Sequence, residues 1–72
     1  MSTATVQESR TALVLRESPI PALRKLSIEE TEAIILINGK VPSYYLKQMA
    51  QEAIMPLLDG RALVNRVLVV GH

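Results

Sequence analysis

The sequence predicts an α+β fold: a two-layer α/β sandwich in the order α-β-β-α-β, with two helices on one face of a three-stranded mixed sheet. An uninterrupted apolar run from Ala33 to Ile37 is typical of a central strand, and the segment Leu46–Leu57 repeats its apolar residues at helical spacing. The chain has 72 residues, of which 49% are hydrophobic. It therefore holds at most one small domain, in which several of the apolar side chains must be almost fully buried.

The N-terminal part predicts a tail and a short helix. Residues 1–6 are small and polar and are expected to be a disordered tail, followed by a single domain over 7–70 and a second tail at 71–72. Good helix formers from Gln7 to Glu17 predict the first helix. The two prolines of Ser18–Pro21 end it, because proline disfavours helical geometry in the preceding residue.

The next segments predict two paired strands. Apolar and polar residues alternate over Arg24–Glu30, which indicates a strand with one buried face. Thr31 and Glu32 make a tight turn into Ala33–Ile37, so these two strands are expected to be antiparallel. The second strand shows no alternation, which favours burial on both faces. A buried helical turn is the alternative that periodicity alone leaves open.

The C-terminal half predicts a crossover helix and a third strand. Ser43 is placed to cap a helix whose regular part ends near Met55, because Pro56 has no backbone N–H. Asp59 and Gly60 form a turn, and Ala62–Val70 is the third strand. A strand–helix–strand unit makes the second and third strands parallel and the crossover right-handed, which gives the strand order 1-2-3.

Gly39, Ser43 and Asn65 are expected to have structural roles. If Ile37 faces the helices, Gly39 does so too by the period of two, and the missing Cβ lets the second helix cross close to the end of the strand. The alternative is a true Asn-Gly hairpin turn. We consider the hairpin less favourable, because it leaves Lys40–Val41 as a strand of two residues.

Several of these motifs resemble the BON domain, named after bacterial osmotically inducible and nodulation proteins. They are Ser27–Glu29, the run from Ile35 through Gly39 to Ser43, the small residues Ala50 and Ala53, and Val64–Val69 in the last strand. The resemblance covers about Leu13 to Val70, and its most specific elements are the glycine and the V-x-S step into the helix. One departure is Met55–Arg61, which stands where the family usually has a Gly-Val step.

The resemblance implies a module without catalytic residues that associates with phospholipid or with other proteins. It also implies a bacterial protein with a role in the stress response, and the lipid alternative implies protection against membrane or osmotic stress. No cofactor follows from the resemblance.

Composition narrows the function classes. The formal charge is +1 and the charges are interspersed, so the sequence offers no basic footprint for nucleic acid. There is no cysteine, which removes thiolate chemistry and disulfides. The first ten residues lack a signal-peptide pattern and the apolar runs fall far short of the ~20 residues of a membrane span. We therefore expect a cytoplasmic protein, peripheral at the membrane if the lipid alternative holds.

Candidate catalytic and ligand-binding residues each have a simpler explanation. Glu29, Glu30 and Glu32 lie close in sequence, but no histidine accompanies them and solvated turn charge is the commoner case. His72 is assigned nothing. Tyr44 and Tyr45 are able to stack on bases, yet no basic patch surrounds them, so we expect Tyr45 to pack at the helix start and Tyr44 to be half exposed. We predict no enzyme activity, metal, cofactor or small-molecule substrate.

The most informative feature is the sheet face that the helices leave uncovered. Alternation directs one set of side chains inward, namely Ile35, Ile37, Leu63, Val67 and Val69. It directs the other set outward, and this forms the predicted interaction surface: Ile34, Leu36, Val64, Leu68 and Val70. The alternative is that the N-terminal segment or a loop folds over this face.

Two hypotheses remain. The first is a protein-association module that binds itself or a protein partner through this surface. The second is a peripheral phospholipid-binding module. The residues favour the first, because the chain has no Trp or Phe to insert into a bilayer.

Overall fold

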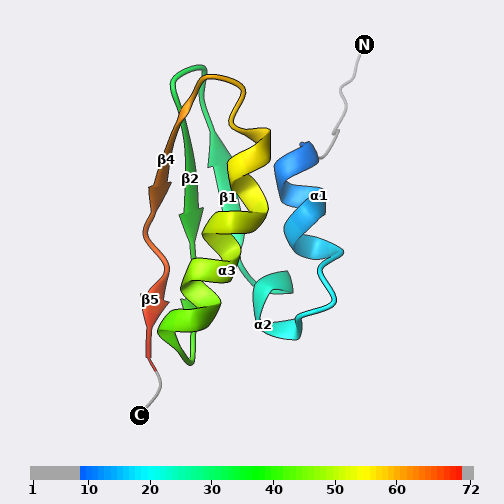
Figure 1. The fold of residues 1–72 in the computed structure, drawn as a ribbon, viewed down its shortest axis with the longest axis vertical. Coiled ribbons are helices and arrows are strands. Elements are labelled where there is room, and N and C mark those ends of the chain that lie inside the picture. The colour runs from blue at the N-terminus through cyan, green and yellow to red at the C-terminus, as the bar shows by residue number, and fades with distance from the viewer. Residues whose placement is uncertain (1–8, 71–72) are drawn as a thin grey trace.

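The computed structural model describes residues 9–70. Figure 1 shows two helices, then three strands, then a longer helix that continues into a 3-10 turn, and finally two strands. The elements are α1 (Arg10–Arg16), α2 (Pro21–Arg24), β1 (Ser27–Glu30), β2 (Ile34–Asn38), β3 (Lys40–Val41), α3 (Tyr44–Ile54), the 3-10 helix η1 (Met55–Leu57), β4 (Ala62–Asn65) and β5 (Leu68–Val69). The predicted tails at 1–6 and 71–72 lie outside the described residues.

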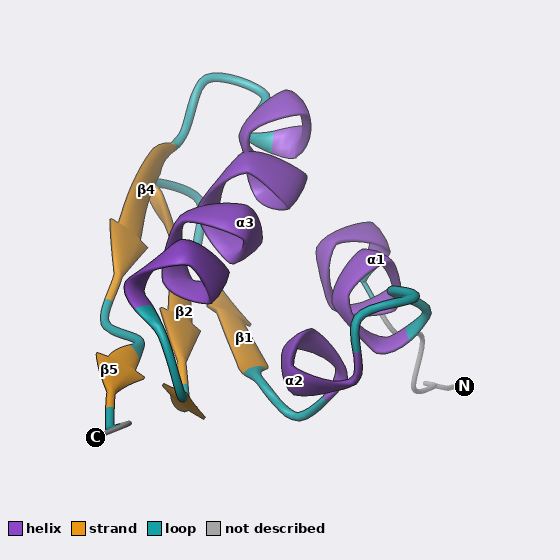
Figure 2. Cartoon of the chain, turned by 60° about the horizontal axis from the view of Figure 1, so that its bottom comes forward, coloured by secondary structure: helices purple, strands orange, loops and turns teal. Residues whose placement is uncertain are grey.

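The predicted α+β architecture is confirmed. The main sheet has the order β1-β2-β4, in which β1 pairs antiparallel with β2 and β2 pairs parallel with β4. The helices all lie on one face of it (Figure 2). This is the mixed sheet that the tight turn after β1 and the crossover through α3 predict.

The predicted third strand, Ala62–Val70, is interrupted. Its first part is β4 and its second part is β5, which pairs parallel with β3. The register does not change across the interruption: Ile37 is the partner of Asn65, and Lys40 is the partner of Leu68. The backbone N–H of Arg66 donates to the carbonyl of Ile37 at 2.9 Å, so the two segments continue one line of pairing.

The N-terminal helices differ from the prediction. The hydroxyl of Ser9 accepts a hydrogen bond from the Ala12 N–H and starts α1 at Arg10, later than the predicted Gln7. The segment Pro21–Arg24 forms a short extra helix, which shortens the predicted strand at Arg24–Glu30. Pro21 lies beyond the end of α1 and suits the first position of α2, because that position needs no N–H.

The crossover helix has the predicted limits. The Ser43 hydroxyl accepts from the Leu46 N–H at 3.3 Å and caps α3, and regular helix ends at Ile54. Pro56 then lies in the 3-10 turn η1, where its missing N–H removes no α-helical bond from α3. A turn with positive φ at Asp59 and Gly60 leads into β4.

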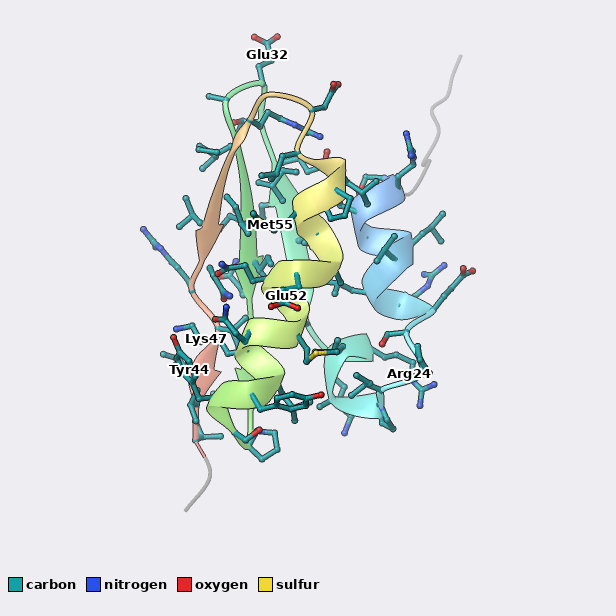
Figure 3. All side chains as sticks on the ribbon, viewed as in Figure 1. Arg24, Glu32, Tyr44, Lys47, Glu52 and Met55 are labelled. Carbon is teal, nitrogen blue, oxygen red and sulfur yellow. The ribbon has the colours of Figure 1, made fainter. Side chains whose placement is uncertain are left out.

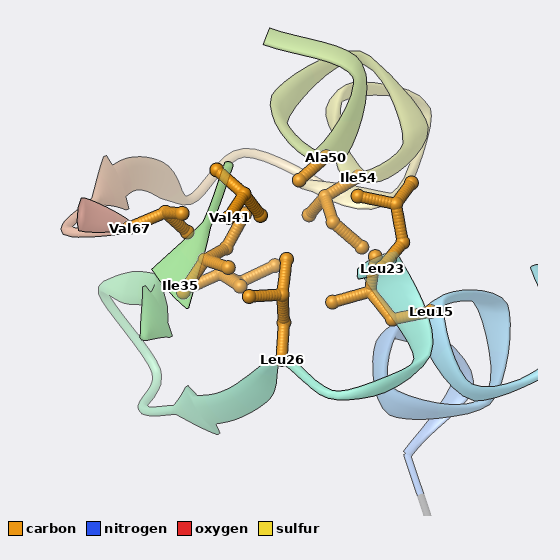
Figure 4. Close-up of a cluster of buried hydrophobic side chains, with 9 residues drawn as sticks. Leu15, Leu23, Leu26, Ile35, Val41, Ala50, Ile54 and Val67 are labelled. Atoms are coloured by element: carbon orange, nitrogen blue, oxygen red, sulfur yellow. The ribbon is translucent and has the colours of Figure 1, made fainter. Parts of the chain in front are cut away.

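The core lies between the sheet and the helices, with contributions from every layer (Figure 4). Ile35 and Ile37 of β2 are completely buried, as are Ala50 and Ile54 of α3 and Val67 between β4 and β5. The remaining buried apolar residues are Leu15, Leu23, Leu26 and Val41. The core is aliphatic throughout, as the composition predicts.

Gly39 permits a close approach, but its neighbour is not the one predicted. A Cβ at this position would lie 2.4 Å from Leu26 Cδ2 and 3.3 Å from Leu26 Cα, whereas the prediction placed the second helix there. Its φ of 138° is also a conformation that side chains with a Cβ rarely adopt. The hairpin alternative is absent as well, because Lys40–Val41 forms a two-residue strand that pairs with β5 rather than with β2.

Candidate functional site

The surface of the sheet that faces away from the helices is the candidate site, and we call it the outer face. Alternation and register place these residues on it: Ser27, Glu29, Ile34, Leu36, Asn38, Lys40, Ala62, Val64, Arg66, Leu68 and Val70. Within residues 9–70, no helix or loop covers this face (Figure 2). The suggestion that the N-terminal segment covers it concerns residues 1–8, which lie outside the described part.

The five predicted surface residues form two groups on this face. Leu36 is the direct register partner of Val64, and Ile34 precedes Leu36 on the same strand and face. These three side chains are half-buried against each other and the sheet. Leu68 and Val70 follow nearer the C-terminus and are 57% and 55% exposed. Asn38 and Arg66 lie between the groups, so the apolar surface is divided by a polar row.

The predicted inward set holds except at its end. Ile35, Ile37 and Val67 are fully buried, and Leu63 packs against the core. Val69 was predicted to be inward too, but it is 44% exposed. It occupies an inward position beside the buried Val41 in the last register pair, where the sheet ends and little protein remains to cover it.

The side chain of Asn65 links β4 to the crossover helix α3 by hydrogen bonds. Its side-chain amide donates to the Lys47 carbonyl at 3.1 Å and to Gln51 Oε1 at 3.3 Å, both on α3. Its Oδ1 accepts the backbone N–H of Val67 at 3.1 Å. This bond lies at the interruption between β4 and β5.

A polar network joins three segments at the other end of the sheet, and sequence reasoning missed it. Glu30 was interpreted as a solvated turn charge, but its carboxylate accepts from the hydroxyl of Thr11, which is 2% exposed, and from Arg61 Nη1 at 2.9 Å. Arg61 also donates to the carbonyls of Leu57 and Leu58. Alternation along β1 directs Glu30 to the same side as the buried Ile35. This alternation was the signal in the sequence that could have revealed the network.

Hydrogen bonding sets the ionisation of this carboxylate. The bond from Thr11 is the main cause that lowers the pKa of Glu30 below its ordinary value of 4.5. Burial opposes this effect, and the weaker contribution of Arg61 lowers the pKa further. The network borders a surface hollow lined by Arg10, Thr11, Glu30, Pro56, Leu57, Asp59 and Arg61. Because the side chains of Thr11, Glu30 and Arg61 bond to one another or to backbone carbonyls, the arrangement is that of a structural link.

The tyrosines are more exposed than predicted. Tyr44 is 66% exposed and Tyr45 is 67% exposed, so Tyr45 does not pack at the helix start. Both occupy the first turn of α3, whereas Leu46 and Ala50 provide its contact with the core. Figure 3 labels Tyr44 at this end of the molecule, and shows Glu52 and Met55 on the surface of α3 and η1 away from the sheet.

Residues 9–70 contain no group of three or more acidic or histidine side chains arranged to hold a metal ion. In the same part of the chain, none of the helices has the length and apolar character needed to cross a membrane. No family model, characterised protein or solved structure that was compared with this chain matches it.

Proposed function

We propose that this chain is a non-enzymatic association module that binds another protein surface, a second copy or a different partner, through the outer face. The observation that carries the proposal is the uncovered pair Leu36 and Val64 together with the exposed Leu68 and Val70. Small antiparallel or mixed sheets with one covered face commonly keep the other face polar. An apolar outer face is therefore typical of an interface.

The size of the outer face limits the affinity. Nine residues along β4 and β5, from 62 to 70, extend for about 30 Å and three strands span about 14 Å, which gives on the order of 400 Å². Stable complexes bury about 800 Å² on each partner. At about 25 cal/mol per Å², an apolar part of a few hundred Å² contributes several kcal/mol before the cost of association. The geometry supports a weak or transient contact.

The chemistry of the face favours protein over lipid. A module that lies on a bilayer draws on a basic surface or on inserted aromatic residues. The outer face instead carries an acid, Glu29, and two bases, Lys40 and Arg66, around aliphatic side chains, and the whole chain has no Trp or Phe. Mixed charge around an apolar centre is the usual anatomy of a protein interface. The phospholipid alternative is retained as an outcome of the test.

The test is site-specific photo-cross-linking in cells that make the protein. A photoreactive benzoylphenylalanine replaces Leu68 on the outer face, and a matched control replaces Met55, which is 50% exposed on the helical side. We expect a protein adduct from position 68 and none from position 55. An adduct of twice the chain mass of 7.9 kDa identifies a second copy, and a heavier or lighter adduct identifies another protein.

Two results would contradict the proposal. Equal adducts from both positions would show that the outer face has no special role. Adducts with lipid alone at position 68 would replace protein association by the phospholipid alternative.

A further inference from the structure

The outer face carries three charged side chains, Glu29, Lys40 and Arg66, and none of them has a partner within residues 9–70. Glu29 lies on β1 and Arg66 directly follows β4, and these strands are the opposite edges of the main sheet. Within residues 9–70, no hydrogen bond or ion pair involves either side chain, and both residues are exposed. Two strand spacings separate them by about 10 Å across the sheet, so they are too far apart to pair within one copy.

We infer that the partner of the outer face is a second copy of this chain, stacked sheet against sheet about a two-fold axis that runs along the strands. This inference rests on the proposed function. Such an axis places β1 of one copy over β4 of the other and β2 over β2. Leu36 then meets its own counterpart, and Glu29 lies above Val64, whose next outward neighbour is Arg66.

The arrangement is self-complementary because the axis creates the same contact twice. Glu29 of each copy faces Arg66 of the other, with the aliphatic side chains between the two ion pairs. Two-sheet packings of this kind keep their strands aligned within about 30°, as the axis requires. The outer face is about half the area of a standard interface, so we expect a weak dimer in which the charges fix the orientation.

Pairing of two copies through the edge of the sheet is disfavoured. The Val67 N–H, which alternation directs to the free edge, is already bonded to Asn65 Oδ1. An antiparallel pairing centred near this point also brings Arg66 of one copy towards Arg66 of the other, and no acidic residue lies between 62 and 70 to offset the repulsion. Stacking of the outer faces does not require the Val67 N–H. It opposes Lys40 of one copy to Lys40 of the other at the end of the face, and the two contacts between Glu29 and Arg66 offset this repulsion.

Charge reversal tests the inference. The purified 72-residue wild type, Glu29→Arg and Arg66→Glu are compared by sedimentation equilibrium up to millimolar concentration. In a dimer of either single variant, positions 29 and 66 carry the same charge and face each other at two places. We therefore expect the dimer dissociation constant to rise about tenfold, and we expect this rise to be smaller at high salt. An equimolar mixture of the two variants restores both opposite-charge contacts and should form a heterodimer with wild-type affinity. Glu32→Arg and Arg24→Glu, exposed charges away from this face, are the matched controls and should dimerise like wild type.

A single chain with both reversals, Glu29→Arg with Arg66→Glu, should also dimerise like wild type and gives a second reading if a single variant folds poorly. A wild type that stays monomeric, single variants that dimerise as wild type does, or a mixture without recovery would each overturn the inference. If position 68 still cross-links to another protein in cells, the proposed function survives such a result. If it does not, both fail together.

Discussion

Ile34 and Ile35 are chemically identical neighbours on β2, and they have opposite surroundings. Ile35 faces the helices and is completely buried, whereas Ile34 lies on the outer face and is half-buried. The same contrast separates Ile37 from Leu36. The apolar run from Ala33 to Ile37 therefore places side chains on both faces of the sheet, and within residues 9–70 only the inner face is covered.

The comparison shows how burial and function are divided in so small a domain. On the inner face, helices α1, α2 and α3 supply the covering side chains, and polar residues such as Asn65 and Glu30 are fully engaged. On the outer face, the polar residues Glu29 and Arg66 have no partner within residues 9–70. Substitutions on the inner face should therefore change the free energy of unfolding, and substitutions on the outer face should change the affinity of association.

The largest expected effect comes from the inner face. Ile35→Ala should lower the free energy of unfolding by about 4 kcal/mol, because it leaves a cavity in a fully buried site. Ile34→Ala removes the same atoms from the half-buried face and should cost about 1 kcal/mol. Urea unfolding of both variants measures the difference. Equal losses would show that the outer face is covered in solution.

Gly39 tests the conformation between β2 and β3. Gly39→Ala should destabilise the domain by about 2–3 kcal/mol, because its Cβ overlaps Leu26 and φ is 138°. Gly60→Ala is the control for backbone strain alone, since φ there is 87° and no atom lies within 4 Å of the added Cβ. Thermal melts should rank Gly39→Ala as the less stable variant. The reverse order would contradict the contact with Leu26.

Asn65 tests the link between α3 and the sheet. Asn65→Ala removes two donated bonds and one accepted bond, and should cost about 1–2 kcal/mol. Asn65→Asp keeps the acceptor for Val67 but places a carboxylate against the Lys47 carbonyl and Gln51 Oε1. We expect Asn65→Asp to be at least as unstable as Asn65→Ala in chemical denaturation. Wild-type stability of both would show that the helix is held without these bonds.

The ionisation of Glu30 should make stability depend on pH. Its pKa is lowered in the folded state, chiefly by the Thr11 hydroxyl, so its stabilising contribution is present above about pH 4.5 and is lost as the pH falls further. Glu30→Gln keeps an acceptor for Thr11 but does not ionise, and should lose less stability between pH 5 and pH 3 than wild type. Urea midpoints at several pH values measure this. Parallel pH profiles would show that another group controls the acid response.

The smallest expected change in stability comes from the outer face. Leu36→Lys with Leu68→Lys should change the free energy of unfolding by about 1 kcal/mol or less, because lysine keeps its stem on the surface and its charge in water. The same variant should abolish association in sedimentation experiments. Val14→Lys with Met55→Lys adds equal charge on the helical side and should associate like wild type. Unfolding of the outer-face variant would place Leu36 in the core.

The sequence was sufficient for the elements that have strong local signals. The apolar run predicted the central strand of the sheet, and Ser43 and Pro56 predicted the limits of α3. Alternation predicted which side chains point to each face of the sheet. Three features depend on contacts far apart in sequence and were missed. The short helix α2 begins at Pro21 and buries Leu23 in the core, Asn65 bonds to α3 beside the interruption of its strand, and Glu30 is paired with Thr11 and Arg61.

The network around Glu30 has a consequence for folding kinetics. It joins Thr11 to a residue 19 positions away and Arg61 to one 31 positions away, so it closes two long loops at once. We expect these side-chain contacts to form after β1, β2 and β4 have paired, because that pairing brings Glu30 and Arg61 to the same end of the sheet. Loss of the Arg61 side chain should then raise the unfolding rate and leave the folding rate almost unchanged. The network around Glu30 therefore prolongs the lifetime of the native state by slowing unfolding.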